Sequence, residues 1–207
     1  MRNLKRIRTV FLSLALVLSL CIPAYAAMED TGFSDVAADA WYTEFVVYCR
    51  DNGLMAGTSA TTFSPDVSTT RGLSRLAGTP AVSGTDSYTD TQSGAWYSDA
   101  VLWASQNGVV SGYGNGLFGT NDPLTREQMA TILYRYAQEK QYDVSGRNDL
   151  SAFADAARVS AYAKEAMQWA VDAGLISGIG DNLVPQNGAN RAQVATMLMR
   201  FAENVNQ

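Results

Sequence analysis

Three arginines hold an unusual position in this sequence of 207 residues, because each stands in the first turn of a predicted helix. Arg126 follows Thr125, Arg191 follows Asn190, and a weaker copy of the pattern contains Arg71. A cation in the first turn opposes the helix dipole, at a cost of a few tenths of a kcal/mol where it is exposed. Free backbone N–H groups beside a guanidinium also form an anion-binding site. The pattern therefore indicates three candidate anion sites.

Each arginine belongs to one copy of a repeat of about fifty residues, and repeats decide the architecture of a chain. Unit one maps onto unit two by adding 55 to each residue number. Unit two maps onto unit three by adding 66 over the first predicted helix and 65 over the second. We therefore divide the chain into units one, two and three at 33–78, 88–139 and 153–204, with polar linkers at 79–87 and 140–152 and a short segment, 27–32, ahead of unit one.

Each unit predicts two helices and one loop. The first helix opens at an aromatic residue and ends twelve residues later at a glycine, which adopts the left-handed conformation without a steric penalty. A second glycine, four residues further on, begins a polar loop that ends at a large apolar residue, which we call the anchor. In chain order the opener, the two glycines and the anchor are Trp41, Gly53, Gly57 and Phe63; Trp96, Gly108, Gly112 and Phe118; and Tyr162, Gly174, Gly178 and Leu183.

The second helix begins with a capping box in units two and three, where Gln128 pairs with Thr125 and Gln193 with Asn190. An apolar stripe at helical spacing follows. No unit is large enough to bury such a stripe alone, so we expect one all-α domain of three helix-loop-helix repeats. Unit one departs from the pattern, because Gly72 follows its arginine and Pro80 ends its second helix early.

Other residues of the repeat admit two interpretations. An aspartate near the start of each unit, Asp35, Asp90 and Asp155, could form an internal salt bridge with an arginine. This is compatible with ligand binding, since an arginine held by an aspartate still has further donors. Trp41 and Trp96 start amphipathic helices, which favours a core position over a ligand-stacking surface.

The N-terminal 26 residues have the organisation of a secretory signal peptide. Four basic residues precede an apolar run at 10–22, and Ala24-Tyr25-Ala26 supplies the cleavage site. The run is too short for a comfortable membrane span. Cys21 raises lipidation as an alternative, although the bulky Leu20 before it disfavours a lipoprotein signal. We expect a secreted protein with no membrane span in the mature chain.

Composition narrows the classes of function. The mature chain would keep eleven Lys and Arg against twenty Asp and Glu, a formal charge of −9, which argues against nucleic acid and anionic membranes as partners. It would keep one cysteine, Cys49, and the sequence contains no histidine that could activate it. We expect Cys49 to be a buried small hydrophobe. No metal-ligand cluster or cofactor motif appears.

Together these residues resemble the S-layer homology domain family. The resemblance rests on Phe33-Ser34-Asp35-Val36 with Trp41, the Gly53 and Gly57 pair, Phe63-Ser64-Pro65, and Thr125-Arg126-Glu127 as a form of the family's TRAE-like motif. It extends from about residue 32 to residue 204 in three copies in register.

The resemblance implies a fold and a function. Members fold as three helical repeats around a pseudo-threefold axis, as a spindle with three prongs, and bind a secondary cell-wall polysaccharide with pyruvylated amino sugars in grooves between repeats. The motif arginine would meet the ketal carboxylate, aromatic residues would stack on sugars, and glycines would let the ligand approach the backbone. The implied binding residues are Arg71, Arg126, Arg191, Trp41, Trp96, Gly57, Gly112 and Gly178, and we add Asp35, Asp90 and Asp155 as their candidate partners.

The implied protein is a non-catalytic anchor on a cell surface of the Gram-positive type, and two alternatives remain. The first is a structural or assembly role through a partner surface protein or self-association, which the acidic composition suits. The second is a hydrolase of wall glycan, which would need two carboxylates at a defined separation. Asp99, Glu127 and Glu165 are acids of the chain, but no sequence context marks them as catalytic.

Overall fold

The computed structural model describes residues 30–69 and 81–205, and this part of the chain contains helices and no strands. The α-helices are α1 (Thr43–Asp51), α2 (Ser98–Gln106), α3 (Arg126–Glu139), α4 (Lys164–Asp172) and α5 (Arg191–Asn204). Short 3-10 turns, η1 (Leu150–Ala152), η2 (Ala156–Arg158) and η3 (Ala161–Ala163), precede α4. The predicted all-α class is confirmed. The signal-peptide prediction, Cys21, Arg71 and Pro80 lie outside the described residues.

Both predicted capping boxes are present, and they fix where α3 and α5 begin. The Thr125 hydroxyl accepts from the backbone N–H of Gln128 at 3.2 Å, while the Gln128 amide oxygen accepts from the N–H of Thr125 at 3.0 Å. The Asn190 and Gln193 pair repeats this arrangement at the start of α5. These bonds place Arg126 and Arg191 at the first helical position.

The first helix of each unit ends as the glycine pattern predicts. Gly53, after α1, has a φ of 67°, and its N–H bonds the carbonyl of Arg50 at 3.1 Å. The N–H of Leu54 bonds the carbonyl of Cys49 at 2.8 Å, which completes a Schellman motif. Equivalent bonds follow α2 and α4. Each ending turns the chain sharply into the loop that leads to the anchor.

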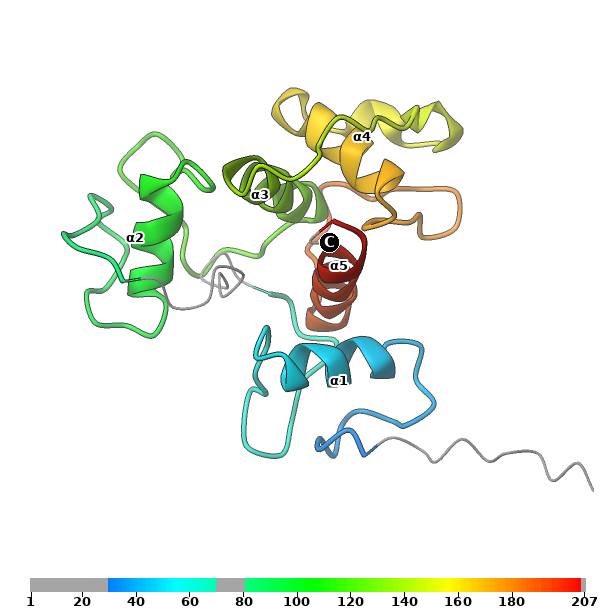
Figure 1. Ribbon diagram of the computed structural model, residues 1–207, viewed down its shortest axis with the longest axis horizontal. Coiled ribbons are helices and arrows are strands. Elements are labelled where there is room, and N and C mark those ends of the chain that lie inside the picture. The colour runs from blue at the N-terminus through cyan, green and yellow to red at the C-terminus, as the bar shows by residue number, and fades with distance from the viewer. Residues whose placement is uncertain (1–29, 70–80, 206–207) are drawn as a thin grey trace, which may run out of the picture.

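Among the described α-helices, the most extensive packing joins different units. In Figure 1, α1, α2 and α4 form three arms around a centre that contains α3 and α5. The first helix of unit three, α4, packs on the second helix of unit two, α3. The first helix of unit one, α1, packs in the same way on the second helix of unit three, α5. The last unit of the repeat is therefore attached to the first, and the three units form a closed ring.

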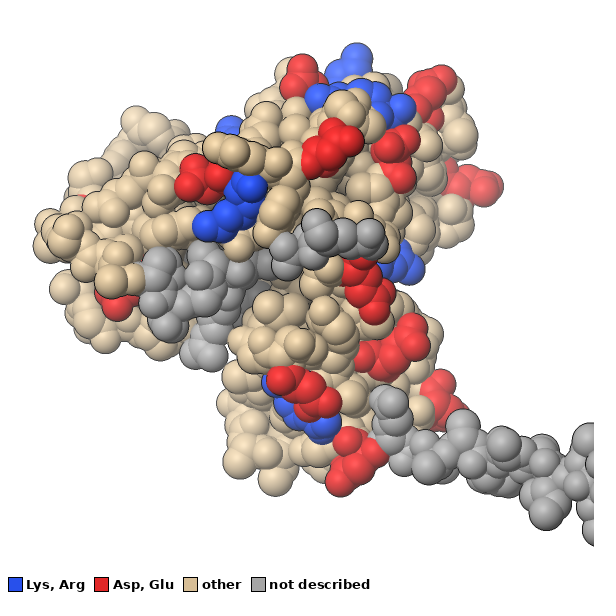
Figure 2. Space-filling model, viewed as in Figure 1, with Lys and Arg blue, Asp and Glu red and all other residues tan. Residues whose placement is uncertain are grey.

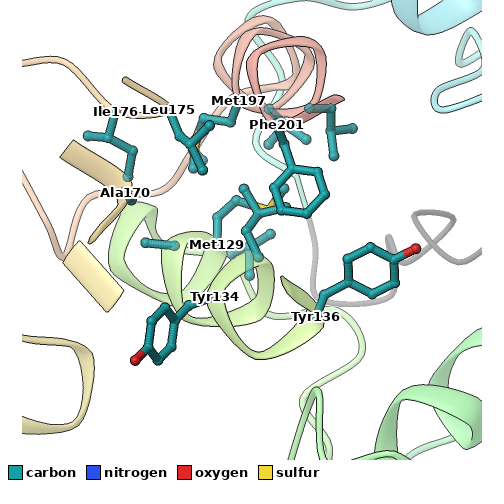
Figure 3. Packing of buried hydrophobic residues seen from close by; sticks show 14 of the residues in the cluster. Met129, Tyr134, Tyr136, Ala170, Leu175, Ile176, Met197 and Phe201 are labelled. Atoms are coloured by element: carbon teal, nitrogen blue, oxygen red, sulfur yellow. The ribbon is translucent and has the colours of Figure 1, made fainter. Parts of the chain in front are cut away.

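Apolar side chains fill the space between the paired helices. Trp169 of α4 is buried and contacts the rings of Tyr134 on α3, at 5.5 Å, and Phe201 on α5, at 6.4 Å. Figure 3 shows Phe201 directed toward α3, with Met129 beside it. Cys49 on α1 is fully buried, as expected, and contacts the carbonyl of Ala195 on α5 at 3.4 Å. Burial raises the pKa of its thiol to about 12.

A cycle of three backbone hydrogen bonds marks the pseudo-threefold axis. The residues involved, Thr69, Leu124 and Ala189, each stand two positions before a motif arginine. The N–H of Thr69 bonds the carbonyl of Ala189 at 2.9 Å, that of Ala189 bonds Leu124 at 2.7 Å, and that of Leu124 bonds Thr69 at 2.7 Å. All three residues are buried. The three units are thus joined at this point, directly before the starts of α3 and α5.

Candidate binding grooves between the repeats

Arg126 connects unit two to the loop of unit three. Its side chain is only 5% exposed, and its Nε donates to the carbonyl of the anchor Leu183 at 2.9 Å. Its Nη2 donates to the carbonyl of Ser177, also at 2.9 Å. A guanidinium has five N–H donors, and within the described residues these two carbonyls are the acceptors assigned to Arg126. The side chain therefore joins unit two to unit three and still has N–H groups that can donate to another acceptor.

Arg191 makes the same contacts from unit three to unit one. Its Nε donates to the carbonyl of the anchor Phe63 at 2.7 Å, and its Nη2 donates to the carbonyl of Ala56 at 2.5 Å. The guanidinium also lies over the ring of Phe63, 4.5 Å from its centroid. Burial lowers the pKa of Arg191, and the charge of Asp35 acts in the opposite direction. Such a group remains protonated at any physiological pH.

The predicted salt bridges between aspartate and arginine are not formed in the described residues, and each aspartate binds backbone amides instead. Asp155 accepts from the N–H groups of the anchor Leu183, at 2.7 Å, and of Val184, at 2.8 Å. Asp35 and Asp90 hold the loops of their own units in the same way. The backbone groups of the anchors Phe63 and Leu183 are thus hydrogen-bonded on both sides. The aspartate of its own unit accepts from its N–H, and the arginine of the preceding unit donates to its carbonyl.

Asp35 and Asp90 make the stability of the fold sensitive to acid. Hydrogen bonds from the N–H groups of Phe118 and Gly119 lower the pKa of Asp90. Burial raises the pKa of Asp35, but hydrogen bonds from Phe63 and Ser64 and the charge of Arg191 outweigh it, so this pKa is lowered too. A carboxyl group whose pKa is lower in the folded state than in the unfolded state stabilises the fold at pH values above its unfolded pKa. This stabilisation is lost as the pH falls through its folded pKa.

We therefore expect the melting temperature of the mature chain to fall as the pH drops below about 4, the unfolded pKa of aspartate. The variant Asp90→Asn should melt lower than the parent at pH 7 and lose less on acidification. Calorimetry at pH 7, 5, 4 and 3 measures both effects. An equal loss in parent and variant would contradict the assignment to Asp90.

The N-termini of α3 and α5 do not offer free amides, which corrects the anion-site prediction for these two helices. The N–H groups of Arg126 and Glu127 bond the carbonyls of Asn187 and Pro185 in unit three, at 3.0 and 2.9 Å. The first two amides of α5 bond unit one in the same way, at 3.0 Å each. The third amide of each helix is bonded by its capping residue. The backbone amides at the starts of α3 and α5 therefore supply no free donor for an anion.

The second glycine of each unit is needed for the loop to fold. A Cβ built on Gly178 would lie 2.8 Å from the carbonyl oxygen of Gly180 and 2.9 Å from the ring of Phe153. Gly57 and Gly112 meet the corresponding aromatic side chain of their own units, Phe33 and Tyr88. The structural role predicted for these glycines is thereby supported, and their contact with a ligand stays a prediction.

A groove lies between the loop of unit three, the exposed face of α5 and the start of unit one, and we call it the α5 groove. Its volume is about 400 Å³. The lining brings Arg126 of unit two together with Trp41 of unit one and Arg200 of α5, and it contains no carboxylate. The remaining lining residues are Leu175, Ile176, Ser177, Gly178, Ile179, Gln193, Thr196 and Met197.

The α3 groove is the equivalent space one unit earlier, with a volume of about 310 Å³. Tyr162 takes the place of Trp41, and Arg135 takes that of Arg200. Arg71, the counterpart of Arg126, lies outside the described residues. The other lining residues are Val109, Val110, Ser111, Gly112, Tyr113, Gln128, Thr131 and Ile132, and they match those of the α5 groove position by position.

Two aspects of the grooves differ from the prediction or were missed. Trp41 and Trp96 are 62% and 63% exposed, so the expected core position is wrong. Trp41 instead presents its ring to the α5 groove. Arg135 and Arg200 were not among the predicted binding residues. The sequence did contain a signal for them, because α3 and α5 share a stripe of glutamine, threonine, an apolar residue and arginine at helical spacing. The stripe consists of Gln128, Thr131, Ile132 and Arg135 in α3, and of Gln193, Thr196, Met197 and Arg200 in α5.

The described residues contain neither a metal-binding group nor a membrane-spanning helix. No group of three or more Cys, Asp or Glu in them is arranged to hold a metal ion. No helix in the described ranges is both long and apolar enough to cross a membrane. On the face in Figure 2, acidic side chains are scattered, and the region around α2 carries few charges.

The arrangement of closed ring, anchored loops and repeated grooves agrees with the sequence comparisons. The signature of the S-layer homology domain matches residues 32–72, 87–130 and 152–195. The chain therefore belongs to the S-layer homology domain family and contains three tandem repeats of it.

Similar proteins in this family include surface proteins and enzymes. The chain is 31% identical to the surface-layer 125 kDa protein of Lysinibacillus sphaericus, over 92% of this chain and 16% of that protein. It is 28% identical to an endoglucanase of Bacillus sp. (strain KSM-635), over 98% of this chain and 23% of that protein. It is 25% identical to S-layer protein sap of Bacillus anthracis, over 95% of this chain and 24% of that protein. The chain thus spans less than a quarter of each of these relatives.

Proposed function

We propose that the protein is a non-catalytic module that anchors to the cell surface by binding an anionic cell-wall polysaccharide. The observation that carries this proposal is the α5 groove, where Arg126, Arg200 and Trp41 converge without a carboxylate. Residues 27–207 have a formal charge of −9, and two of their eleven Lys and Arg lie in this groove. Two guanidinium groups in a concave site suit a ligand with a fixed negative charge.

The groove suits an anionic sugar in particular. The exposed ring of Trp41 offers an apolar face for the C–H face of a sugar. Arg126 is held by two loop carbonyls, so its orientation is fixed before the ligand arrives. Gly178 has no side chain, so the groove wall at this position does not project toward the ligand. A pyruvate ketal on an amino sugar has the required carboxylate beside an apolar face, and we propose a secondary wall polymer that carries such sugars as the ligand.

Two of the relatives are named as surface-layer proteins, which favours assembly through protein partners or self-association as a second candidate. The endoglucanase supports no catalytic role for this chain, because the similarity covers less than a quarter of that enzyme. We assign no reaction to the grooves.

The test is co-sedimentation of the mature chain, residues 27–207, with purified sacculi of a Gram-positive bacterium, before and after the wall polymer is removed with acid. Binding to intact sacculi alone is expected. Trp41→Ala and Arg200→Ala should each weaken it at least about fivefold, the value of one lost charged or stacking contact. These residues are only partly buried, so their loss should leave the fold intact.

A matched variant serves as the control. Arg158→Ala removes an exposed arginine that lines neither described groove. It should bind like the parent. Binding to stripped sacculi as well would point to peptidoglycan instead of the polymer. No binding to either would favour the assembly role, which self-association at increasing concentration would then reveal.

A further inference from the structure

Phe45 on α1 contacts two of the residues that line the α5 groove. Its ring lies 6.4 Å from that of Trp41, measured between centroids, at an interplanar angle of 57°. The guanidinium carbon of Arg200 lies over the same ring, 5.7 Å from its centroid. Phe45 is half-buried and packs against the core, outside the lining of the groove. One side chain of α1 therefore contacts both the aromatic ring and one of the two cations of this groove.

The packing of the repeat does not require a ring at this position. Adding 55 and then 66 to its number places Ala100 and Ala166 where unit one has Phe45. Ala166 is buried in α4, which packs on α3 as α1 packs on α5. The equivalent pair of helices is thus formed with an alanine. Phe45 is particular to unit one, and its two contacts belong to the α5 groove.

The contact with Phe45 restricts Arg200 without using its hydrogen-bond donors. A guanidinium has five N–H groups, and the attraction of a cation to the face of a ring needs no hydrogen bond from them. Within the described residues, one acceptor is assigned to Arg200, the carbonyl of Gly174, at 3.4 Å from Nη1. Donors thus remain for an anion in the groove. A side chain that is already restricted loses less entropy when the ligand binds.

The ring of Trp41 is restricted as well. It is 62% exposed and stands just before α1. Tyr42 contacts it at 5.3 Å and nearly at right angles, and Phe45 contacts it from one helical turn further on. Trp96 has the first of these contacts, with Tyr97 at 5.5 Å, but no counterpart of the second. Two neighbouring rings therefore give Trp41 a defined orientation, although most of its surface is open to a ligand.

We propose that Phe45 is the positioning residue of the α5 groove, which holds the guanidinium of Arg200 and the ring of Trp41 in place before an anionic sugar binds. This rests on the proposed function and deepens it, because it assigns the preorganisation of the site to a residue outside its lining. Loss of the ring should weaken binding although no group that touches the ligand is removed.

The first test uses residues 27–207 without ligand. It follows the NMR signals of the Arg200 Hδ protons and of the Trp41 indole N–H, which Arg200→Ala and Trp41→Phe identify. Phe45→Leu keeps an apolar side chain but removes the ring, so both signals should move as its ring current is lost. Phe45→Tyr keeps the ring and should leave them near their parent positions. Tyr48→Leu is the control, since it removes another half-buried ring of α1 that is not paired with either residue in the described part of the chain.

The second test measures affinity for intact sacculi. Phe45→Leu should weaken binding about 2- to 5-fold, the value of a cation–π contact at a partly exposed site. Phe45→Tyr should bind within about twofold of the parent. When Arg200→Ala is already present, Phe45→Leu should weaken binding by a smaller factor, because one of the two residues through which it acts is gone.

The proposal is overturned if Phe45→Leu leaves both signals unmoved, if Tyr48→Leu moves them as far, or if Phe45→Tyr binds as weakly as Phe45→Leu. Failure of the proposed function has a different signature. The parent would then not bind intact sacculi at all, and the signals of the free protein would still decide whether Phe45 holds Arg200 and Trp41 in place.

Discussion

Replacing Arg191 with alanine is expected to lower the free energy of unfolding by about 2–4 kcal/mol, because one buried and one partly buried carbonyl lose a charged donor. These are the carbonyls of Phe63 and Ala56, which belong to the far end of the sequence from α5. The cation over the ring of Phe63 is lost as well. Urea unfolding of residues 27–207, evaluated with one m-value for the parent and the variant, measures the change in the free energy of unfolding.

Two further variants make this result specific. Arg191→Lys should recover only part of the loss, since an ammonium lacks the planar fork that reaches both carbonyls. Arg200→Ala removes a half-buried arginine from the same helix and should change stability by less than about 0.5 kcal/mol. If Arg191→Ala unfolded at the same urea concentration as Arg200→Ala, the interface role would be wrong. For the same reason alanine variants of Arg126 and Arg191 do not isolate ligand binding from folding.

The second large effect is expected at an anchor. Phe63→Ala should cost about 3–5 kcal/mol, since the ring is fully buried and its removal leaves a cavity. The ring contacts Phe33 at 5.5 Å and supports the guanidinium of Arg191, so its loss disturbs a loop and an interface together. The measurement is again the urea midpoint.

The repeat supplies the control for this prediction. Unit three has Leu183 at the anchor position, with the same contacts to an aspartate and an arginine. Phe63→Leu should therefore cost less than about 1.5 kcal/mol. A loss as large as that of Phe63→Ala would mean that the aromatic ring itself, and not a filled anchor, is required in unit one.

Local structure could be predicted from the sequence where neighbouring residues determine it. The capping boxes and the glycine endings depend on residues within a few positions of each other, and both were confirmed. The anchors are buried, as their apolar character predicts. The pairing of α4 with α3, and of α1 with α5, could not be predicted in this way. Because the repeats are alike, each first helix presents a similar face to every second helix, and the pattern does not tell which copy it meets.

The candidate site was predicted in part. Arg126 and Gly178 line the α5 groove, and their contact with a ligand stays a prediction. The expected free amides at the starts of α3 and α5 do not exist. Their loss as an anion site has a physical reason: neighbouring units supply carbonyls to those amides, which a sequence read one unit at a time does not reveal. Trp41 was placed in the core on amphipathic grounds, but it lies in the turn just before α1, where its ring is not directed by the helix stripe.

The closed ring also has a consequence for the order of events during folding. The contacts between units two and three span about 50–60 residues, whereas those that attach unit three to unit one join residues 128, 135 and 146 apart in sequence. Contacts so distant cost the most chain entropy to form and tend to come late. A nascent chain would thus expose the buried face of α1 until α5 has been made. Pairing of that face with another surface before α5 arrives would compete with closure of the ring.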